Sequence, residues 1–262
     1  MELDTEDVLY EVKNGIAYIT LNRPSAGNSI SLTMQAALPI VWADVRDNPL
    51  VRVAIVTGAG GKHFCTGVDL KEAQRVGFLK VEGPLSSDVR LTARHNGVWK
   101  PVICAVNGVV AGGGLHFVVD ADLIVAASHA QFLDSHVNVG QVGGIENIGL
   151  AKRLPLGTAL RMTLVGREYR LSAERAHHFG LVDELVAPED LMATSVAIAE
   201  QIKKNSPQAV SLSQQAIWNS LEVSYRDAME YGWEMVKLHR QHPDSTEGPV
   251  AFAEGREPRW VD

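Results

Sequence analysis

Three consecutive glycines, Gly112 to Gly114, are the first feature of this sequence whose residue types and spacing could do chemistry. Glycine lets the backbone turn freely and approach a ligand closely, because it has no Cβ. The apolar residues 115–119 follow directly and could begin a buried helix, and the first N–H groups of a helix have no partner within it. The pattern therefore predicts N–H donors that point at an oxygen carrying negative charge.

A strand and a turn must position this glycine run. Residues 102–106 form a short apolar run with β-branched residues, which is typical of a buried strand, and Asn107-Gly108 is a turn signal. Residues 51–56 and 122–126 are two further apolar runs that predict buried strands. We therefore expect an α/β protein in which a strand, a glycine turn and a helix start follow one another.

The rest of the chain supplies other predicted elements. Residues 8–21 alternate in polarity and break at Asn14-Gly15, which predicts a β-hairpin. Residues 31–47 predict a helix with Ser31 as its N-cap and a kink at Pro39. Residues 71–92 are mixed in character and predict a mobile segment with short helices that covers the site. The pattern further predicts helices over 150–154, 158–165 and from 189 to about 241, and a strand over 181–186.

The composition is that of an ordinary globular protein. Its 262 residues are 46% hydrophobic and 21% charged, enough for one sizeable domain or a domain with an appendage. The net charge of −7 argues against nucleic acid or an anionic membrane as a partner. Cys65 and Cys104 lie in apolar runs, which indicates a reducing compartment. No apolar run reaches the roughly 18–20 residues of a membrane span, and the acidic N-terminus has no signal core, so we expect a cytoplasmic protein.

Several common motifs are absent. The loop 57–62 resembles a phosphate-binding loop only superficially, because Val56 and His63 stand where that pattern requires Gly and Ser or Thr. The Gly-x-Ser-x-Gly pattern of serine hydrolases does not occur either. The sequence alone therefore excludes the simplest nucleotide-binding and serine-hydrolase interpretations.

Several motifs resemble, in order and spacing, those of the crotonase (enoyl-CoA hydratase/isomerase) superfamily. The segment 100–114, Lys-Pro-Val-Ile-Cys-Ala-Val-Asn-Gly-Val-Val-Ala-Gly-Gly-Gly, is similar to the signature of that family. The similarity runs from Asn22-Arg23-Pro24 to the segment 247–252, Glu-Gly-Pro-Val-Ala-Phe. The resemblance implies an enzyme that acts on an acyl-CoA thioester, whose coenzyme A is part of the substrate, with no other cofactor.

The resemblance also implies the architecture. The fold would be a crotonase-type superhelix of ββα units over residues 1–195. A helical region over residues 196–262 would pack at the subunit interface of a homotrimer or a dimer of trimers. Small-molecule substrate and further copies of the chain are then the only partners that we expect.

The same resemblance assigns an oxyanion hole. Val68 follows a glycine in the segment 63–70, His-Phe-Cys-Thr-Gly-Val-Asp-Leu, and its N–H would act together with that of Gly113. One such donor stabilises a transition state by about 3–4 kcal/mol. For Arg23, a place near the CoA phosphates and a solvated loop charge are equally good interpretations. The residues implied near substrate or CoA are Arg23, Lys62, Thr66, Val68, Asp69, Leu70, Lys71 and Gly113.

The chain departs from the family at two positions. Hydratases of the family use two glutamates there to activate water and protonate the α-carbon, whereas this sequence has His116 and His136. An imidazole with a pKa near ~6.5 can act as acid or base, although a histidine on an apolar helix can also be a core residue. Asp134 or Glu146 could orient His136 through its second ring nitrogen, and Glu146 is the better candidate.

Three functions remain open. The first is an enoyl-CoA hydratase or isomerase with His116 and His136 as acid/base groups. The second is a C–C hydrolase of a β-diketone, in which His136 and Glu146 activate water, and the third is a non-catalytic acyl-CoA-binding homologue. His116, His136 and Glu146 could also form a two-His-one-carboxylate metal set, but the sequence has no His-Glu-x-x-His or Cys-x-x-Cys signature, so we expect no metal.

Overall fold

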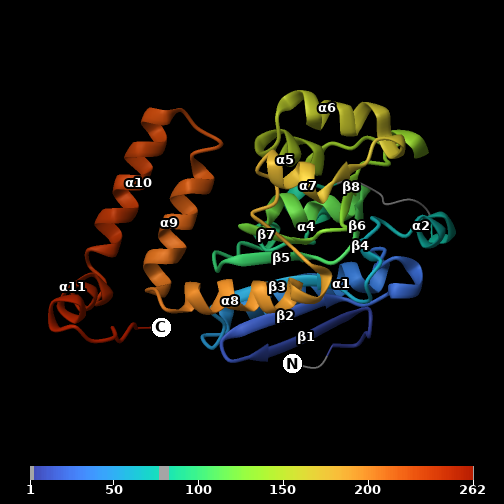
Figure 1. Ribbon diagram of the computed structural model, residues 1–262. Helices are drawn as coiled ribbons and strands as arrows, with labels where there is room; N and C mark the ends of the chain where they lie inside the picture. The colour runs from blue at the N-terminus through green and yellow to red at the C-terminus, as the bar shows by residue number, and fades with distance from the viewer. Residues whose placement is uncertain (1–2, 77–82, 262) are drawn as a thin grey trace.

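Two β-sheets form the centre of the protein (Figure 1), whose computed structural model describes residues 3–76 and 83–261. The larger sheet has the strand order β1-β2-β3-β5-β7-β10 and the smaller has the order β4-β6-β8-β9. The larger sheet contains β1 Val8–Lys13, β2 Ile16–Leu21, β3 Val53–Gly58, β5 Val102–Val106, β7 Leu123–Ala127 and β10 Glu184–Val186. The smaller contains β4 His63–Cys65, β6 Val109–Ala111, β8 Gln131–Leu133 and β9 Leu171–Ser172.

The two sheets are built by one repeated unit. β3, β5 and β7 lie parallel in the larger sheet, and each is followed in the sequence by β4, β6 or β8 in the smaller sheet, where these three are also parallel. Each pair then leads into a helix: α2 Leu70–Val76, α4 Leu115–Asp120 or α5 Ile145–Arg153. The predicted α/β superhelix of ββα units is thereby confirmed.

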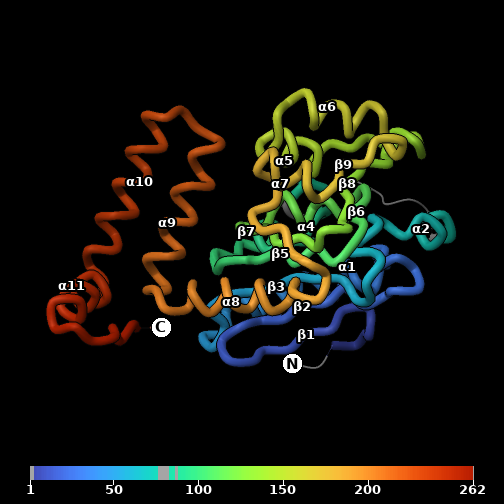
Figure 2. Tube along the Cα trace, viewed as in Figure 1, coloured from blue at the N-terminus to red at the C-terminus, as the bar shows by residue number. Residues whose placement is uncertain are grey.

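The other helices cover the sheets or lie beyond them. They are α1 Leu32–Asp47, α3 Leu85–Asp88, α6 Leu156–Val165, α7 Ala173–His178, α8 Leu191–Lys203, α9 Pro207–Asn219, α10 Tyr225–His239 and α11 Asp244–Glu254. Figure 2 shows α9, α10 and α11 standing apart from the sheets, whereas α8 lies across the larger one. No helix in the described ranges is long and apolar enough to cross a membrane.

The local predictions in the first half of the chain are largely confirmed. β1 and β2 form an antiparallel hairpin around Asn14 and Gly15, both with positive φ. Ser31 caps α1 by accepting a hydrogen bond from the backbone N–H of Met34 at 3.0 Å, and Pro39 lies within the helix. The segment 71–92 contains most of α2 and all of α3, and part of that prediction, 77–82, lies outside the described residues.

The predicted helix bounds in the second half are less accurate. α5 begins at Ile145, five residues before the predicted start, and it includes Glu146 in its first turn. The predicted helical stretch 189–241 is divided among α8, α9 and α10, because α9 starts at Pro207 and α10 at Tyr225, each after a serine cap. The division at 195/196 stays a prediction, and α8 runs continuously across it.

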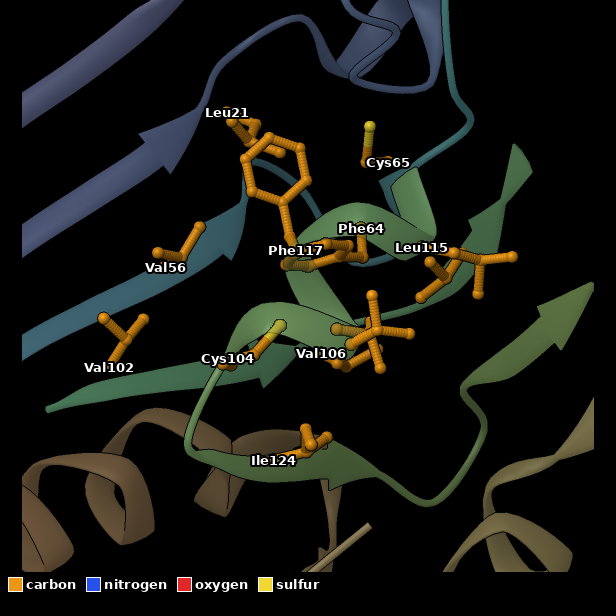
Figure 3. Packing of buried hydrophobic residues seen from close by; sticks show 14 of the residues in the cluster. Leu21, Val56, Phe64, Cys65, Val102, Cys104, Val106, Leu115, Phe117 and Ile124 are labelled. Carbon is orange, nitrogen blue, oxygen red and sulfur yellow. The ribbon is translucent and has the colours of Figure 1, made fainter. Parts of the chain in front are cut away.

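The core holds the short helix α4 firmly against the sheets. Leu115 and Phe117 extend from α4 into a cluster that includes Leu21, Val56 and Phe64 (Figure 3). The rings of Phe64 and Phe117 meet edge to face with centroids 6.1 Å apart. Because neighbouring residues of a helix point about 100° apart, His116 is fixed on a different face by the packing of the residues on either side of it.

Candidate active site

Three neighbouring strand ends build the site. β4, β6 and β8 are parallel neighbours, so their carboxyl ends lie at the same edge of the smaller sheet. The chain continues from β4 to Val68, from β6 to the glycine run and His116, and from β8 to Asp134 and His136. Residues far apart in the sequence are therefore brought together by the register of three short strands.

Two backbone N–H groups meet at the first two of these ends. Val68 pairs with Ile30 in a parallel bridge in which the N–H of Ile30 donates to Gly67 and that of Asp69 donates to Ile30. Because successive N–H groups of an extended chain alternate in direction, the N–H of Val68 points away from Ile30. A Cβ built on Gly113 would stand 3.6 Å from the nitrogen of Val68, so the two residues border one small space.

Glycine is required beside this space. Gly67 has φ +88°, and a Cβ there would lie 2.9 Å from the nitrogen of Gly113. Gly113 is the second residue of the 3₁₀ turn Gly112–Gly114, so its N–H lies among those that have no acceptor within the turn. Side chains at these positions would strain the backbone or fill the space between the two amides.

Glu146 lies between the two histidines. Its Oε1 is 3.1 Å from Nε2 of His136, and its Oε2 is 3.4 Å from Nε2 of His116. His116 and Glu146 are buried, and His136 is half-buried. The predicted trio of His116, His136 and Glu146 is thus brought together, with the carboxylate in the middle.

Asp134 holds the other side of His136. Its Oδ1 lies 2.6 Å from Nδ1 of His136 and also accepts the backbone N–H of His136 at 3.1 Å. Its Oδ2 accepts a hydrogen bond of 2.7 Å from Nδ2 of Asn147. Of the two carboxylates considered for orienting His136, Asp134 makes the shorter contact and Glu146 occupies the opposite ring nitrogen.

The surroundings shift the pKa values of the two imidazoles in opposite directions. The hydrogen bond to Asp134 raises the pKa of His136 above its ordinary value, against the effect of burial, and Glu146 adds to the rise. Burial lowers the pKa of His116 to about 3, and repulsion from His95 and His136 contributes. Burial raises the pKa of Glu146. The protonated form of His136 is therefore favoured relative to an isolated histidine, whereas His116 is neutral at neutral pH.

The imidazoles and the paired amides belong to one site. Gly112, with φ +49°, lies so close to His136 that a Cβ on it would be 3.6 Å from Cε1 of the ring. The next residue, Gly113, borders the space in front of Val68. A carbonyl oxygen held by the two amides would therefore lie beside His136 and Glu146, which can donate and accept protons. Proton transfer at the carbon next to a carbonyl group requires this arrangement.

Known proteins share this architecture over nearly the whole chain. The sequence profile of the enoyl-CoA hydratase/isomerase family matches residues 11–262. The chain belongs to the enoyl-CoA hydratase/isomerase family.

Individual relatives agree with this assignment. The (E)-benzylidenesuccinyl-CoA hydratase of Thauera aromatica is 35% identical over 260 residues, which cover 97% of this chain and 98% of that protein. The carnitinyl-CoA dehydratase of Escherichia coli K12 is also 35% identical over 260 residues, covering 96% and 97%. The crystal structure of an enoyl-CoA hydratase from Mycobacterium tuberculosis H37Rv has a TM-score of 0.89 at 35% identity, covering 98% and 99% of the two chains. The chain is thus a hydratase/isomerase family enzyme that acts on a CoA thioester.

The residues predicted near CoA have varied surroundings. The guanidinium of Arg23 is 2.9 Å from Oδ2 of Asp69 and donates to Ser29, so it has internal partners. Oδ1 of Asp69 accepts the backbone N–H groups of Lys71 and Glu72 at the start of α2. Thr66 donates to the carbonyl of Gly27. Lys62, Leu70 and Lys71 are exposed to solvent, and the assignment of all these residues to CoA stays a prediction.

A cavity of about 540 Å³ lies beside His116, and neither Val68 nor Gly113 is among its lining residues. Its walls come from α4, α5, α9 and the 3₁₀ turn Arg94–Asn96, and they include apolar residues such as Val119, Ile148 and Leu221. This space is large enough for an acyl group well beyond four carbons.

The structure also adds residues that the sequence did not reveal. Asn147 supports Asp134, and His95 lies edge to face with His116, with ring centroids 5.9 Å apart. Asn147 could have been found from the sequence, because it directly follows the candidate Glu146. His95 could not, because its contact with His116 joins two segments that are distant in the sequence. Within the described ranges, no group of three His, Cys, Asp or Glu side chains has the arrangement of a metal site.

The cysteines contribute packing. Cys65 and Cys104 are buried, and burial raises the pKa of the Cys65 thiol to about 12 and raises that of Cys104 further. Neither thiol is therefore ionised near neutral pH, as a nucleophile would need to be.

Proposed function

We propose that the enzyme adds water to, or removes it from, an acyl-CoA thioester, with His136 and Glu146 exchanging the protons. The amides of Val68 and Gly113 bind the thioester oxygen and stabilise the enolate that forms. The observation that carries the proposal is the position of His136, whose Nδ1 and Nε2 lie 2.6 Å and 3.1 Å from the oxygens of two carboxylates.

These distances support a definite starting state. An ionised carboxylate can only accept hydrogen bonds, so an imidazole between two of them carries a proton on both nitrogens. His136 is then the acid, and Glu146, with its pKa raised by burial, is the base. Neutral His116 lies with its Nε2 3.4 Å from Oε2 of Glu146 and packs against this carboxylate.

The protons balance in each direction. As water attacks the β-carbon of an enoyl-CoA, its O–H bond breaks, the new C–O bond forms and Glu146 takes the proton. The enolate that results takes a proton at its α-carbon from His136. The proton on Glu146 then passes to His136 across the 3.1 Å contact, which restores the starting state. Elimination of water follows the same steps in reverse.

The proposal includes the ligand and the assembly. Arg23, Thr66, Asp69 and Leu70, with Lys62 and Lys71 in the exposed loops, form the region near CoA. The enzyme is a homotrimer or a dimer of trimers, whose contacts involve the C-terminal helices. Coenzyme A enters only as part of the substrate.

The proposal is tested by the loss of enoyl absorbance of crotonyl-CoA, trans-2-octenoyl-CoA and cinnamoyl-CoA. We expect weak turnover of crotonyl-CoA and faster turnover of a larger substrate. His136→Ala and Glu146→Gln should each lower kcat at least about 100-fold. Changing both His116 and His136 to Glu should raise crotonyl-CoA hydration. A His136→Ala enzyme with an unchanged rate, or an inactive wild-type enzyme that binds the three acyl-CoAs, would contradict the acid/base assignment; the second result would favour a non-catalytic acyl-CoA-binding protein.

A second candidate is hydrolysis of a C–C bond in a β-diketone. The contact of 2.6 Å between Asp134 and His136, beside the amides of Val68 and Gly113, favours it, because such a pair suits attack of water on a carbonyl held in an oxyanion hole. Glu146 would take the proton from water, the C–C bond would break, and the leaving enolate carbon would take its proton from His136. Ring opening of cyclohexane-1,3-dione without CoA, together with no turnover of enoyl-CoA, would decide for this candidate.

A further inference from the structure

His95 is a half-buried histidine beside the site, and the proposed reaction gives it no part. It lies in the 3₁₀ turn Arg94–Asn96 and lines the cavity of about 540 Å³ together with His116 and Asp120. Its ring meets that of His116 edge to face, with centroids 5.9 Å apart and an interplanar angle of 69°. A substrate whose thioester oxygen lies at Val68 and Gly113 would reach His95 with a part of the acyl group beyond the reacting carbons.

A chain of hydrogen bonds fixes the tautomer of His95. Asp120 accepts the backbone N–H of Arg94 at 3.2 Å, pairs with the Arg94 guanidinium at 3.4 Å, and receives a hydrogen bond from the Thr92 hydroxyl. Burial raises the pKa of Asp120, whereas the three donors around its carboxyl group act in the opposite direction and favour its ionised, accepting form. The Thr92 hydroxyl thus donates its only hydrogen to Asp120. Its oxygen, 2.9 Å from Nδ1 of His95, can then only accept a hydrogen bond from that nitrogen.

The remaining ring nitrogen is therefore an acceptor. With the proton on Nδ1, Nε2 of a neutral His95 carries a lone pair. Burial lowers the pKa of His95, as does the charge of Arg94, while Asp120 opposes the shift, so the ring is neutral at neutral pH. Within the described part of the chain, no hydrogen-bond partner meets Nε2.

We propose that Nε2 of His95 accepts a hydrogen bond from a hydroxyl group on the acyl moiety, so that the enzyme selects a hydroxylated acyl-CoA. This inference rests on the proposed function for the position of the thioester. A hydroxyl fits better than an ammonium group, because Arg94, Lys152 and Arg153 line the same cavity against the two carboxylates of Asp120 and Glu222. A site that hydrogen-bonds a substrate hydroxyl discriminates against analogues that lack it, since its own polar group is then left unpaired.

The test compares binding of matched, unreactive ligands by titration calorimetry. The pairs are butyryl-CoA with 4-hydroxybutyryl-CoA, and hexanoyl-CoA with 6-hydroxyhexanoyl-CoA, on the full-length protein. We expect the wild type to bind the hydroxylated member of at least one pair about 10-fold more tightly. His95→Phe keeps a ring but loses the acceptor, and it should reduce this preference to less than about 2-fold.

Two further variants make the outcome decisive. Thr92→Val removes the hydroxyl that fixes the tautomer, and it should also weaken the preference if His95→Phe does not fold. His178→Gln changes an exposed histidine at the end of α7 and should bind both pairs as the wild type does. Equal binding of both members by the wild type, or a preference that survives both His95→Phe and Thr92→Val, would overturn the inference.

This readout is independent of turnover. If the preference is found while His136→Ala retains full activity, the acid/base assignment fails and the role of His95 stands. If His136→Ala is inactive and the wild type shows no preference, the role of His95 fails alone.

Discussion

Asn147 is the residue that links the helix α5 to the charge of His136. Its Nδ2 donates a hydrogen bond of 2.7 Å to Oδ2 of Asp134. Burial alone would raise the pKa of Asp134, but hydrogen bonds from His136 and Asn147 outweigh that effect and hold the pKa below its usual value. Asn147→Leu removes one of these bonds, so the pKa of Asp134 rises and the pKa of His136 falls. Because His136 is required as a cation, we expect kcat to fall about 10-fold and the basic limb of the pH–rate profile to move to lower pH.

The pH profile distinguishes this positioning role from simple loss of packing. A variant that is only destabilised would lose activity without moving the basic limb. Gln141→Ala changes an exposed side chain in the loop before α5 and serves as the matched control, with an unaltered profile. If the pH–rate profile of Asn147→Leu superimposes on that of the wild type once both are scaled to the same maximum rate, Asn147 does not act through the pKa of His136.

His116 makes the folded state sensitive to acid. Its pKa is lowered to about 3 by burial, whereas the unfolded value is about 6.5. As the pH falls below the unfolded value, only the unfolded chain takes up the proton, so stability is lost progressively down to the folded value. At about 1.4 kcal/mol per pH unit, the loss between pH 6.5 and pH 5 is about 2 kcal/mol.

His116→Gln removes this titration. Denaturant unfolding at pH 7 and pH 5 should show a difference in unfolding free energy that is smaller by about 2 kcal/mol than in the wild type. His178→Gln, at an exposed position, should leave the difference as it is. A His116→Gln protein with the full wild-type difference would show that other groups cause the acid sensitivity.

The sequence predicted those site residues whose partners are close in the chain. Asp134 and His136 are two residues apart, and Glu146 follows ten residues later, so their meeting needed only a strand end and one turn of helix. Thr92, His95 and Asp120 could not be assigned in this way. Their contacts join the 3₁₀ turn Arg94–Asn96 to α4, and nothing in the local pattern of either segment indicates the other.

At the scale of elements, the two glycine turns carry the proposed oxyanion site. Gly113 has no positive φ, and a Cβ on it would lie 3.5–3.7 Å from its nearest neighbours, which is ordinary van der Waals contact. Gly113→Ala should therefore fold with nearly unchanged stability, yet its methyl group would stand in front of the nitrogen of Val68. We expect kcat to fall about 100-fold or more, as it does when an oxyanion donor is lost.

The control for this prediction is Gly61→Ala in the loop between β3 and β4, where a Cβ would have no neighbour within 4 Å. Thermal unfolding and kcat should both match the wild type there. Wild-type activity in a folded Gly113→Ala protein would mean that the substrate oxygen does not lie between the two amides.

The element predictions succeeded where a strand ended in strong turn signals. The predicted end of β5 at Asn107-Gly108 and the predicted helix start after the glycine run are confirmed, because glycine and asparagine have distinct backbone preferences, whereas the short strand β6 between them was not predicted. The prediction of one continuous helical stretch over 189–241 was wrong, because the helical periodicity continues across the two breaks between α8, α9 and α10. The available signals were Ser206 before Pro207 and Ser224 before Tyr225, whose hydroxyls cap α9 and α10.

At the scale of the whole molecule, side chains of α9, Trp218 and Gln214, hold this helix against the superhelix through Asp122. Trp218 of α9 donates from Nε1 to Oδ1 of Asp122 at 2.7 Å, and the Arg94 guanidinium lies 3.8 Å from the centroid of its ring. Arg94 also pairs with Asp120, which supports Thr92 and His95. The position of α9 is thus coupled to the wall of the cavity of about 540 Å³, so in the proposed trimer the packing of α9 would affect the shape of that cavity.

Beyond α9, helix α10 exposes an apolar stripe that a single chain does not cover. Tyr225, Met229, Trp233 and Val236 recur at helical spacing and are 81%, 58%, 58% and 43% exposed. Contiguous apolar surface of this kind marks a protein–protein contact, and the proposed trimer would bury it.

Changing Met229 and Trp233 together to Glu places two charges in that contact, and light scattering should then give the mass of one chain instead of three or six. Glu230→Gln, on the same helix at an exposed position, should retain the wild-type mass. A double variant that keeps the wild-type mass would show that the subunits meet elsewhere and that α10 has another partner.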